Sequence, residues 1–263
     1  MLFRSARIPE TISRAFHVAM QGRPGPVVIS LPEDMLLDHA EVAIPQRIEP
    51  VETWPGQTQM AELQKMLWAA KSPIAILGGG GWSEKAVASL VRFSERFHLP
   101  VATSFRRASL FPADHPHYAG EIGIGPNPKL KDRIASSDLV LLIGGRMAEM
   151  PSQSYTLFDI PKPQMPFVHV HADAAELGRV YDPTLGINAT PNAFAAALES
   201  LQPPQEIAWA GSAQKAREEF EAWTSKPASH ANALDMADVM LWLRDRLPKD
   251  AIVTNLGGDR KST

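Results

Sequence analysis

Residues 73–104 read PIAILGGGGWSEKAVASLVRFSERFHLPVATS and carry the signals that decide the fold. A continuous apolar run is followed by four glycines and then by an amphipathic segment with Ser83 at its expected N-cap. A second apolar run, LPVATS, closes the stretch. Continuous apolar runs are typical of strands that are covered on both faces, as in parallel sheets. The stretch therefore predicts a strand, a glycine loop, a helix and a parallel strand.

The same alternation extends from residue 59 to residue 201. It predicts an α/β fold, namely a Rossmann-like central domain with a mainly parallel sheet and helices on both faces. In such sheets ligands bind at the carboxyl ends of the strands. We predict helices at 59–72, 83–98, 127–137 and 190–201. Two further strands are predicted in the segments DLVLLIGG, which starts at residue 138, and PFVHVHAD, which starts at residue 166.

The segments on either side of this domain read as incomplete. Residues 8–21 have helical apolar spacing, and VVISL at 27–31 resembles a buried strand. An isolated strand is not stable, because its backbone groups need neighbouring strands. We therefore expect a middle piece of a longer three-domain protein. The predicted divisions are the end of a first α/β domain at 1–37, a linker at 38–58, the central domain at 59–201, a linker with a helix at 202–234, and the start of a third α/β domain at 235–263.

Composition excludes several classes of function. The 263 residues carry a net charge of −3, which argues against nucleic-acid binding. The absence of cysteine excludes disulfides, zinc–cysteine clusters and thiol nucleophiles. No stretch reaches the roughly 20 apolar residues of a membrane-spanning helix, and no signal-peptide core is seen at the N-terminus. We expect a soluble, cytoplasmic protein that does not bind membranes.

Two glycine-containing segments are candidates for a nucleotide site. Gly78, Gly79 and Gly80 follow a strand and precede a helix, where backbone approaches a phosphate closely. The alternative is a tight strand-to-helix turn that binds nothing, since the full G-x-G-x-x-G pattern is absent. Arg146 follows another strand and either reaches a phosphate or pairs with Glu149 on the surface. Arg106, with its neighbour Arg107, adds positive charge at a third strand end.

The remaining polar motifs give weaker signals. His169 and His171 share one side of a predicted strand, but no third ligand has suitable spacing, so we predict no metal site. No G-x-S-x-G pattern accompanies any serine, which leaves hydrolase chemistry unsupported. We predict no catalytic residue within this chain.

Segments in a fixed order resemble thiamine-diphosphate-dependent enzymes of the acetolactate synthase and pyruvate oxidase type. GRPGPVVISLPEDM resembles the end of their pyrimidine-binding domain, and LPKDAIVTN resembles the opening strand of their diphosphate-binding domain. The segments that resemble their middle domain are KSPIAILGGGGW, LPVATSFRRASLFPADHPHYAGEIG, SSDLVLLIGGRM and PFVHVHAD. The resemblance covers residues 8–255.

The resemblance implies decarboxylation of a 2-oxo acid and carboligation in a complete parent enzyme, a transferase or lyase that uses thiamine diphosphate and magnesium. The family's activating glutamate and its magnesium-binding G-D-G…N segment find no counterpart here, and Gly257-Gly258-Asp259 departs from that motif. We therefore expect the chain to be inactive alone. Some relatives bind FAD or ADP in the middle domain, and Gly144-Gly145-Arg146 matches their G-x-R, whereas His171 stands where they have an acid.

Three hypotheses follow. The chain is the central-domain portion of such an enzyme, an FAD- or ADP-binding module, or a structural remnant that associates through exposed apolar surface. The resemblance also implies a homo-oligomer.

Overall fold

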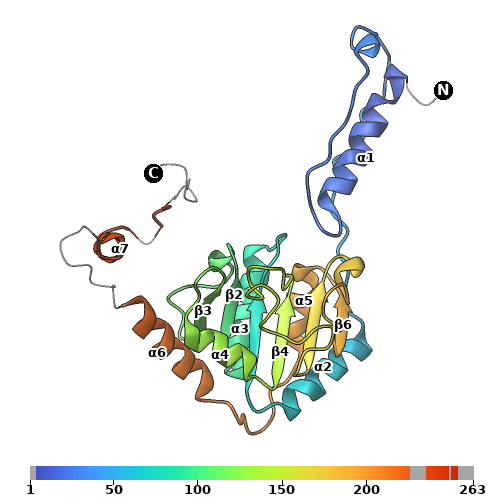
Figure 1. Cartoon of the computed structure of the whole chain (residues 1–263). Coiled ribbons are helices and arrows are strands. Elements are labelled where there is room, and N and C mark those ends of the chain that lie inside the picture. Colours follow the sequence, from blue (N-terminus) through green and yellow to red (C-terminus); the bar gives the residue numbers. More distant parts are fainter. Residues whose placement is uncertain (1–3, 226–234, 249, 254–263) are drawn as a thin grey trace. The chain divides into compact units, whose positions relative to one another are not determined.

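The computed structural model describes residues 4–225, 235–248 and 250–253 (Figure 1). It divides the chain into two compact units, residues 1–220 and residues 221–263. No helix within the described ranges is long and apolar enough to cross a membrane.

The first unit is built on a six-stranded parallel sheet with the order β3-β2-β1-β4-β5-β6. This confirms the predicted α/β class. From β1 the chain runs outward through β2 and β3 and then returns to β4, on the other side of β1. The sequence analysis did not predict β3 or β6. The strands are β1 Pro73–Leu77, β2 Val101–Ser104, β3 Tyr118–Ile122, β4 Leu139–Ile143, β5 Phe167–His171 and β6 Leu185–Asn188.

The helices agree with the predicted ones to within a few residues. Ser83 is the N-cap of α3, where its hydroxyl accepts a hydrogen bond from the Ala86 N–H, as predicted. The helices are α1 Ile8–Met20, α2 Gln57–Ala69, α3 Glu84–Phe97, α4 Pro128–Ala135, α5 Pro191–Ala197, α6 Ser212–Thr224 and α7 Met236–Arg244. Single 3-10 turns lie at η1 Ser5–Arg7, η2 Glu33–Met35, η3 Ala108–Leu110, η4 Ala174–Glu176 and η5 Leu198–Ser200.

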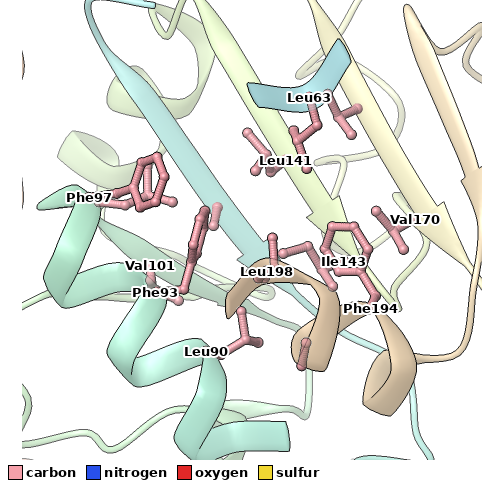
Figure 2. Close-up of a cluster of buried hydrophobic side chains, with 14 of the residues drawn as sticks. Leu63, Leu90, Phe93, Phe97, Val101, Leu141, Ile143, Val170, Phe194 and Leu198 are labelled. Atoms are coloured by element: carbon pink, nitrogen blue, oxygen red, sulfur yellow. The ribbon is translucent and has the colours of Figure 1, made fainter. Parts of the chain in front are cut away.

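One face of the sheet packs against α2, α3 and α5. Alternate residues of β4, Leu141 and Ile143 among them, point into this layer and are fully buried. Figure 2 shows Phe93 of α3 and Phe194 of α5 packing beside them, together with Leu63 of α2. The helices are held here because each one buries an apolar stripe that the solvent would otherwise surround.

The opposite face packs against α4, the loop that follows β4, and the beginning of α6. Leu142 of β4 contacts this second cluster, which includes Leu130 and Phe158. Trp209 is also buried, on the α3 side, and its indole N–H donates to the Phe97 carbonyl at 2.8 Å. Residues of the predicted 202–234 linker therefore belong to the compact unit. The residue limits of the predicted domains stay a prediction.

The N-terminal segment, residues 4–50, differs from its prediction in one respect. Residues 27–31 form no strand, and Val28 is 92% exposed. The predicted strand is wrong here because no described strand lies beside it to pair with its backbone. In the second unit residues 250–253 form no strand either, while Thr254, Asn255 and Gly257-Gly258-Asp259 lie outside the described residues.

Candidate functional site

A hollow with a polar lining lies at the carboxyl ends of β1 and β4, where the strand order reverses. We call it the first cleft; its volume is about 410 Å³. Parallel sheets of this order bind ligands at that point, because the loops on the two sides diverge there. Three arginines contribute to its wall, and no carboxylate among the described residues does. The polar and glycine lining comprises Gly22, Arg23, Gly79, Gly80, Ser104, Arg107, Gly144, Arg146 and His171.

The glycines after β1 and β4 pack backbone against backbone. A Cβ atom on Gly78 would lie 2.7 Å from the Gly145 Cα, and one on Gly79 would clash with the Gly144 carbonyl oxygen. Gly79 and Gly144 also have positive φ angles, which L side chains rarely adopt. Close packing thus accounts for Gly78 and Gly79. Gly80 has open space around it and lines the first cleft, so it is the glycine whose backbone a ligand can approach.

His169 of β5 forms a hydrogen bond with the loop after β4. Its Nε2 lies 3.0 Å from the Gly145 carbonyl oxygen, which can only accept, so the imidazole donates. Burial lowers the pKa of His169 to about 4, and the imidazole is therefore neutral at physiological pH. This hydrogen bond holds the loop after β4 in position. No group of three metal-ligating side chains occurs within the described ranges.

Arg146 pairs with Glu176, which was not among the predicted partners. Its predicted surface partner was Glu149, whereas the structure places its guanidinium 3.5 Å from Glu176 Oε1. Arg23 and Arg179 reach the same oxygen, at 2.9 Å and 3.1 Å. The Glu176 side chain is only 5% exposed. Arg179 is a local partner, three residues further along the chain, whereas Arg23 and Arg146 come from distant segments and could not be foreseen from HADAAELGRV.

Arg106 does not line the first cleft, although the sequence analysis placed it among the candidates. It has a φ of 60°, its backbone N–H donates to Glu121, and its guanidinium lies 5.0 Å from the centre of the Phe105 ring. Arg107 lines the cleft in its place. A turn directly after β2 decides which arginine faces the cleft, and the sequence alone did not distinguish the two.

His171 lines the first cleft, and Asp173 does not. The Asp173 carboxylate instead accepts the Ala175 N–H at 3.0 Å and caps η4. The His171 Nδ1 contacts the Asp173 backbone, and burial lowers the pKa of His171. The Asp173 carboxylate is therefore engaged at η4 and is not among the described residues that line the cleft.

Comparison with known proteins adds a consistent assignment. The family model described as "Thiamine pyrophosphate enzyme, central domain" matches residues 60–198. The acetolactate synthase large subunit of Corynebacterium glutamicum is 30% identical over 178 residues, 66% of this chain and 28% of that protein. The acetolactate synthase isozyme 2 large subunit of Escherichia coli K12 is 26% identical over 249 residues, 94% of this chain and 44% of its own length.

A further relative and a solved structure are also similar to this chain. The glyoxylate carboligase of Escherichia coli O157:H7 is 30% identical over 79% of this chain and 35% of that enzyme. The crystal structure of benzoylformate decarboxylase from Polynucleobacter necessarius has a TM-score of 0.59 at 22% identity, covering 79% of this chain and 38% of that one, and thus shares the fold. This chain spans less than half the length of each of these relatives.

Proposed function

Because this chain belongs to the thiamine pyrophosphate enzyme family, whose central domain it contains, we propose that it serves in an enzyme resembling acetolactate synthase. The observation that carries this proposal is the match over residues 60–198, which includes all six strands of the sheet. In the complete enzyme we propose decarboxylation of a 2-oxo acid and transfer of the resulting carbanion to an acceptor.

The residues of the first cleft do not fit thiamine diphosphate held by magnesium. Magnesium on a diphosphate prefers carboxylate and carbonyl oxygens, and the part of the chain that the structure describes places no carboxylate in the cleft lining. The cofactor supplies the carbanion chemistry wherever it is bound. We therefore propose that thiamine diphosphate and magnesium bind in other parts of the complete enzyme, and that the central domain contributes to its assembly.

The test is an activity assay of the purified 263-residue chain with pyruvate, thiamine diphosphate and magnesium. We expect no acetolactate, whereas a complete acetolactate synthase assayed beside it forms the product. Calorimetric titration with thiamine diphosphate and magnesium checks the binding step separately. Turnover by the chain, or binding of the cofactor in the first cleft, would contradict the proposal.

A second candidate function is binding of a nucleoside diphosphate, as in ADP or FAD, in the first cleft. Arg23, Arg107 and Arg146 surround a hollow without acidic lining, and Gly80 leaves its backbone accessible. Guanidinium groups bind phosphates through paired N–H donors. Because His171 and not a carboxylate stands at this position, we propose that the cleft contacts the diphosphate, which ADP and FAD share, rather than the ribose.

Thermal shift and calorimetry with ADP, FAD and adenosine test this second function. We expect ADP to stabilise the chain and adenosine not to. Arg107→Gln and Arg146→Gln should each weaken ADP binding about tenfold or more, since a hydrogen bond to a charged group contributes about 1.5–3 kcal/mol. Arg179→Gln is the matched control, because Arg179 does not line the first cleft. Equal shifts with ADP and adenosine would argue against a phosphate site.

We also propose that the chain associates with copies of itself. Large apolar side chains are exposed along the N-terminal segment, for example Phe16 at 55% and Leu37 at 89%. Exposed apolar surface of this kind promotes association. Light scattering that gives a monodisperse monomer would count against it. The cytoplasmic location stays a prediction.

A further inference from the structure

Two distant parts of the chain form the wall of the first cleft. Gly22, Arg23 and Pro24 belong to the N-terminal segment, whereas Arg107 and Arg146 follow strands β2 and β4 of the sheet. A ligand that fills this hollow of about 410 Å³ therefore contacts both parts at once. Ligand binding and the position of the N-terminal segment are for this reason connected through one shared surface.

Arg23 is held at the end of α1 by a restricted turn. Directly after this helix the Gly25 N–H donates to the Ala19 carbonyl at 3.0 Å, which closes a turn around Arg23. Gly22 has a φ of 56°, and the ring of Pro24 limits the backbone on the other side. A displacement of α1 therefore moves the Arg23 guanidinium relative to the rest of the cleft.

The ion pair that connects Arg23 to the sheet costs little to break. The guanidinium donates to Glu176 Oε1 at 2.9 Å, but 46% of the Arg23 side chain is exposed, so water screens the pair. Arg146 and Arg179 lie 3.5 Å and 3.1 Å from the same oxygen. Glu176 thus keeps two cationic partners when Arg23 departs. Release of Arg23 avoids the most costly outcome, which is a buried charge without a partner.

The N-terminal segment is stabilised little by packing of α1. This helix buries none of its 13 residues, and large apolar side chains such as Phe16 and Leu37 are exposed. Segments with few buried apolar contacts separate from a domain at a low cost in free energy. The docked and released positions of the segment therefore lie close in free energy, and a ligand that prefers one of them shifts the balance.

We propose that a diphosphate bound in the first cleft latches the N-terminal segment onto the sheet. Its oxygens accept N–H groups from Arg23 on one side and from Arg107 and Arg146 on the other. The released segment withdraws the first of these donors, so the diphosphate binds the docked form more tightly, and binding and docking strengthen each other by the same factor. This inference rests on the second candidate function, and it adds that the ligand controls the position of the N-terminal segment.

The distance between two spin labels on the full chain tests the latch, with inorganic pyrophosphate as the probe. The sequence has no cysteine, so Thr11→Cys on α1 and Lys85→Cys on α3 label one exposed site in each part without background. Pulsed EPR should give a broad distance distribution for the free chain and a narrow one with saturating pyrophosphate. At ten times the Kd, which calorimetry measures separately, the ratio of docked to released chain should rise about tenfold.

Arg23→Gln removes the charge on the N-terminal side of the cleft. It should weaken pyrophosphate binding about tenfold and leave the distance distribution broad even when the cleft is saturated. Arg107→Gln is the matched control, because Arg107 follows β2 and belongs to the sheet side. It should weaken binding by a similar factor, yet the distribution should still narrow at saturation, since Arg23 and Arg146 remain.

The two measurements separate this inference from the function on which it rests. Absence of pyrophosphate binding to the unaltered chain would contradict the second candidate function and the latch together. Binding with an unchanged distance distribution would overturn the latch alone. Equal narrowing in Arg23→Gln and Arg107→Gln at saturation would overturn it as well.

Discussion

Two apolar pentapeptides in this chain differ in structure, since one forms a buried strand and the other forms none. LVLLI at 139–143 is strand β4, with all five residues buried between β1 and β5. VVISL at 27–31 forms no strand and is largely exposed, with Val28 at 92%. Local sequence predicts a buried strand for both. The difference lies in the neighbours, because a strand needs partners for its backbone N–H and C=O groups and a layer on each face.

Helices repeat this contrast. α1 and α3 are both amphipathic, yet α3 buries residues such as Leu90, Phe93 and Phe97, whereas α1 buries none. The apolar face of α1, with Ile12 and Phe16, lines a groove with the returning segment at 44–48. Amphipathic spacing therefore states which face of a helix is apolar, and only the tertiary structure states whether that face is covered.

The largest effect should come from truncating the buried pentapeptide. Leu141→Ala removes a fully buried side chain and should lower the free energy of unfolding by about 2–5 kcal/mol, through lost burial and the cavity left behind. Leu37→Ala is the same change at an 89% exposed site of the N-terminal segment and should stay within about 0.5 kcal/mol. Urea titration measures both. Equal losses would show that the N-terminal segment is packed as tightly as the sheet.

A second substitution tests the glycine contact that joins the loops after β1 and β4. Gly79→Ala meets the Gly144 carbonyl at a φ of 69° and should cost about 2–4 kcal/mol, from a left-handed backbone and overpacking together. Gly25→Ala, in the N-terminal segment, has open space and should be neutral. Thermal unfolding compares the two. A tolerated Gly79→Ala would mean that the loops separate easily.

The third prediction is that the free energy of unfolding depends on pH, because His169 of β5 is buried in the sheet. The folded-state pKa of His169 is about 4, below its ordinary value of 6.5, so the unfolded state binds the extra proton between these values. Stability is then fully present above about pH 6.5 and falls by roughly 3 kcal/mol as the pH drops to about 4. His169→Gln, which can still donate to Gly145, should flatten this part of the curve. Urea titrations across the range measure it, and an unchanged slope would assign the titration to other groups.

The smallest contrast concerns ion pairs. Arg133 of α4 and Glu219 of α6 lie 2.6 Å apart with side chains 16% exposed, so Glu219→Gln should cost about 1–2 kcal/mol. Arg7 and Glu10 are also paired at 2.6 Å, but at the surface. Glu10→Gln should leave stability unchanged within error, since exposed pairs contribute little. Chemical denaturation of both variants makes the comparison, and a larger loss for Glu10→Gln would reverse it.

Several parts of the fold could be predicted, and the failures have physical causes. Apolar runs flanked by turn residues predicted the strands β1, β2, β4 and β5. β3 was missed because Gly120, with a φ of 110°, interrupts its pattern, and β6 because it is a short edge strand that is only partly buried. The parallel order with a reversal between β1 and β4 follows from packing and is not written in any one segment.

The candidate site, too, could be predicted from the sequence only in part. Gly80 and Arg146 were predicted and do line the first cleft, whereas Arg106 turns aside and Arg107 takes its place. Glu176, the shared partner of three arginines, was not foreseen. Two of its three partners, Arg23 and Arg146, come from distant parts of the chain, so the local sequence does not show that this carboxylate is buried.

By itself the sequence determined the α/β class, the positions of the glycine loops and the family, because periodicity and local motifs depend on neighbouring residues. Tertiary structure alone decided which apolar runs become strands, that Gly78 and Gly79 pack against Gly144 and Gly145, and which arginines meet at Glu176. Those outcomes depend on contacts between residues far apart in the chain, where burial and charge pairing set the free energy.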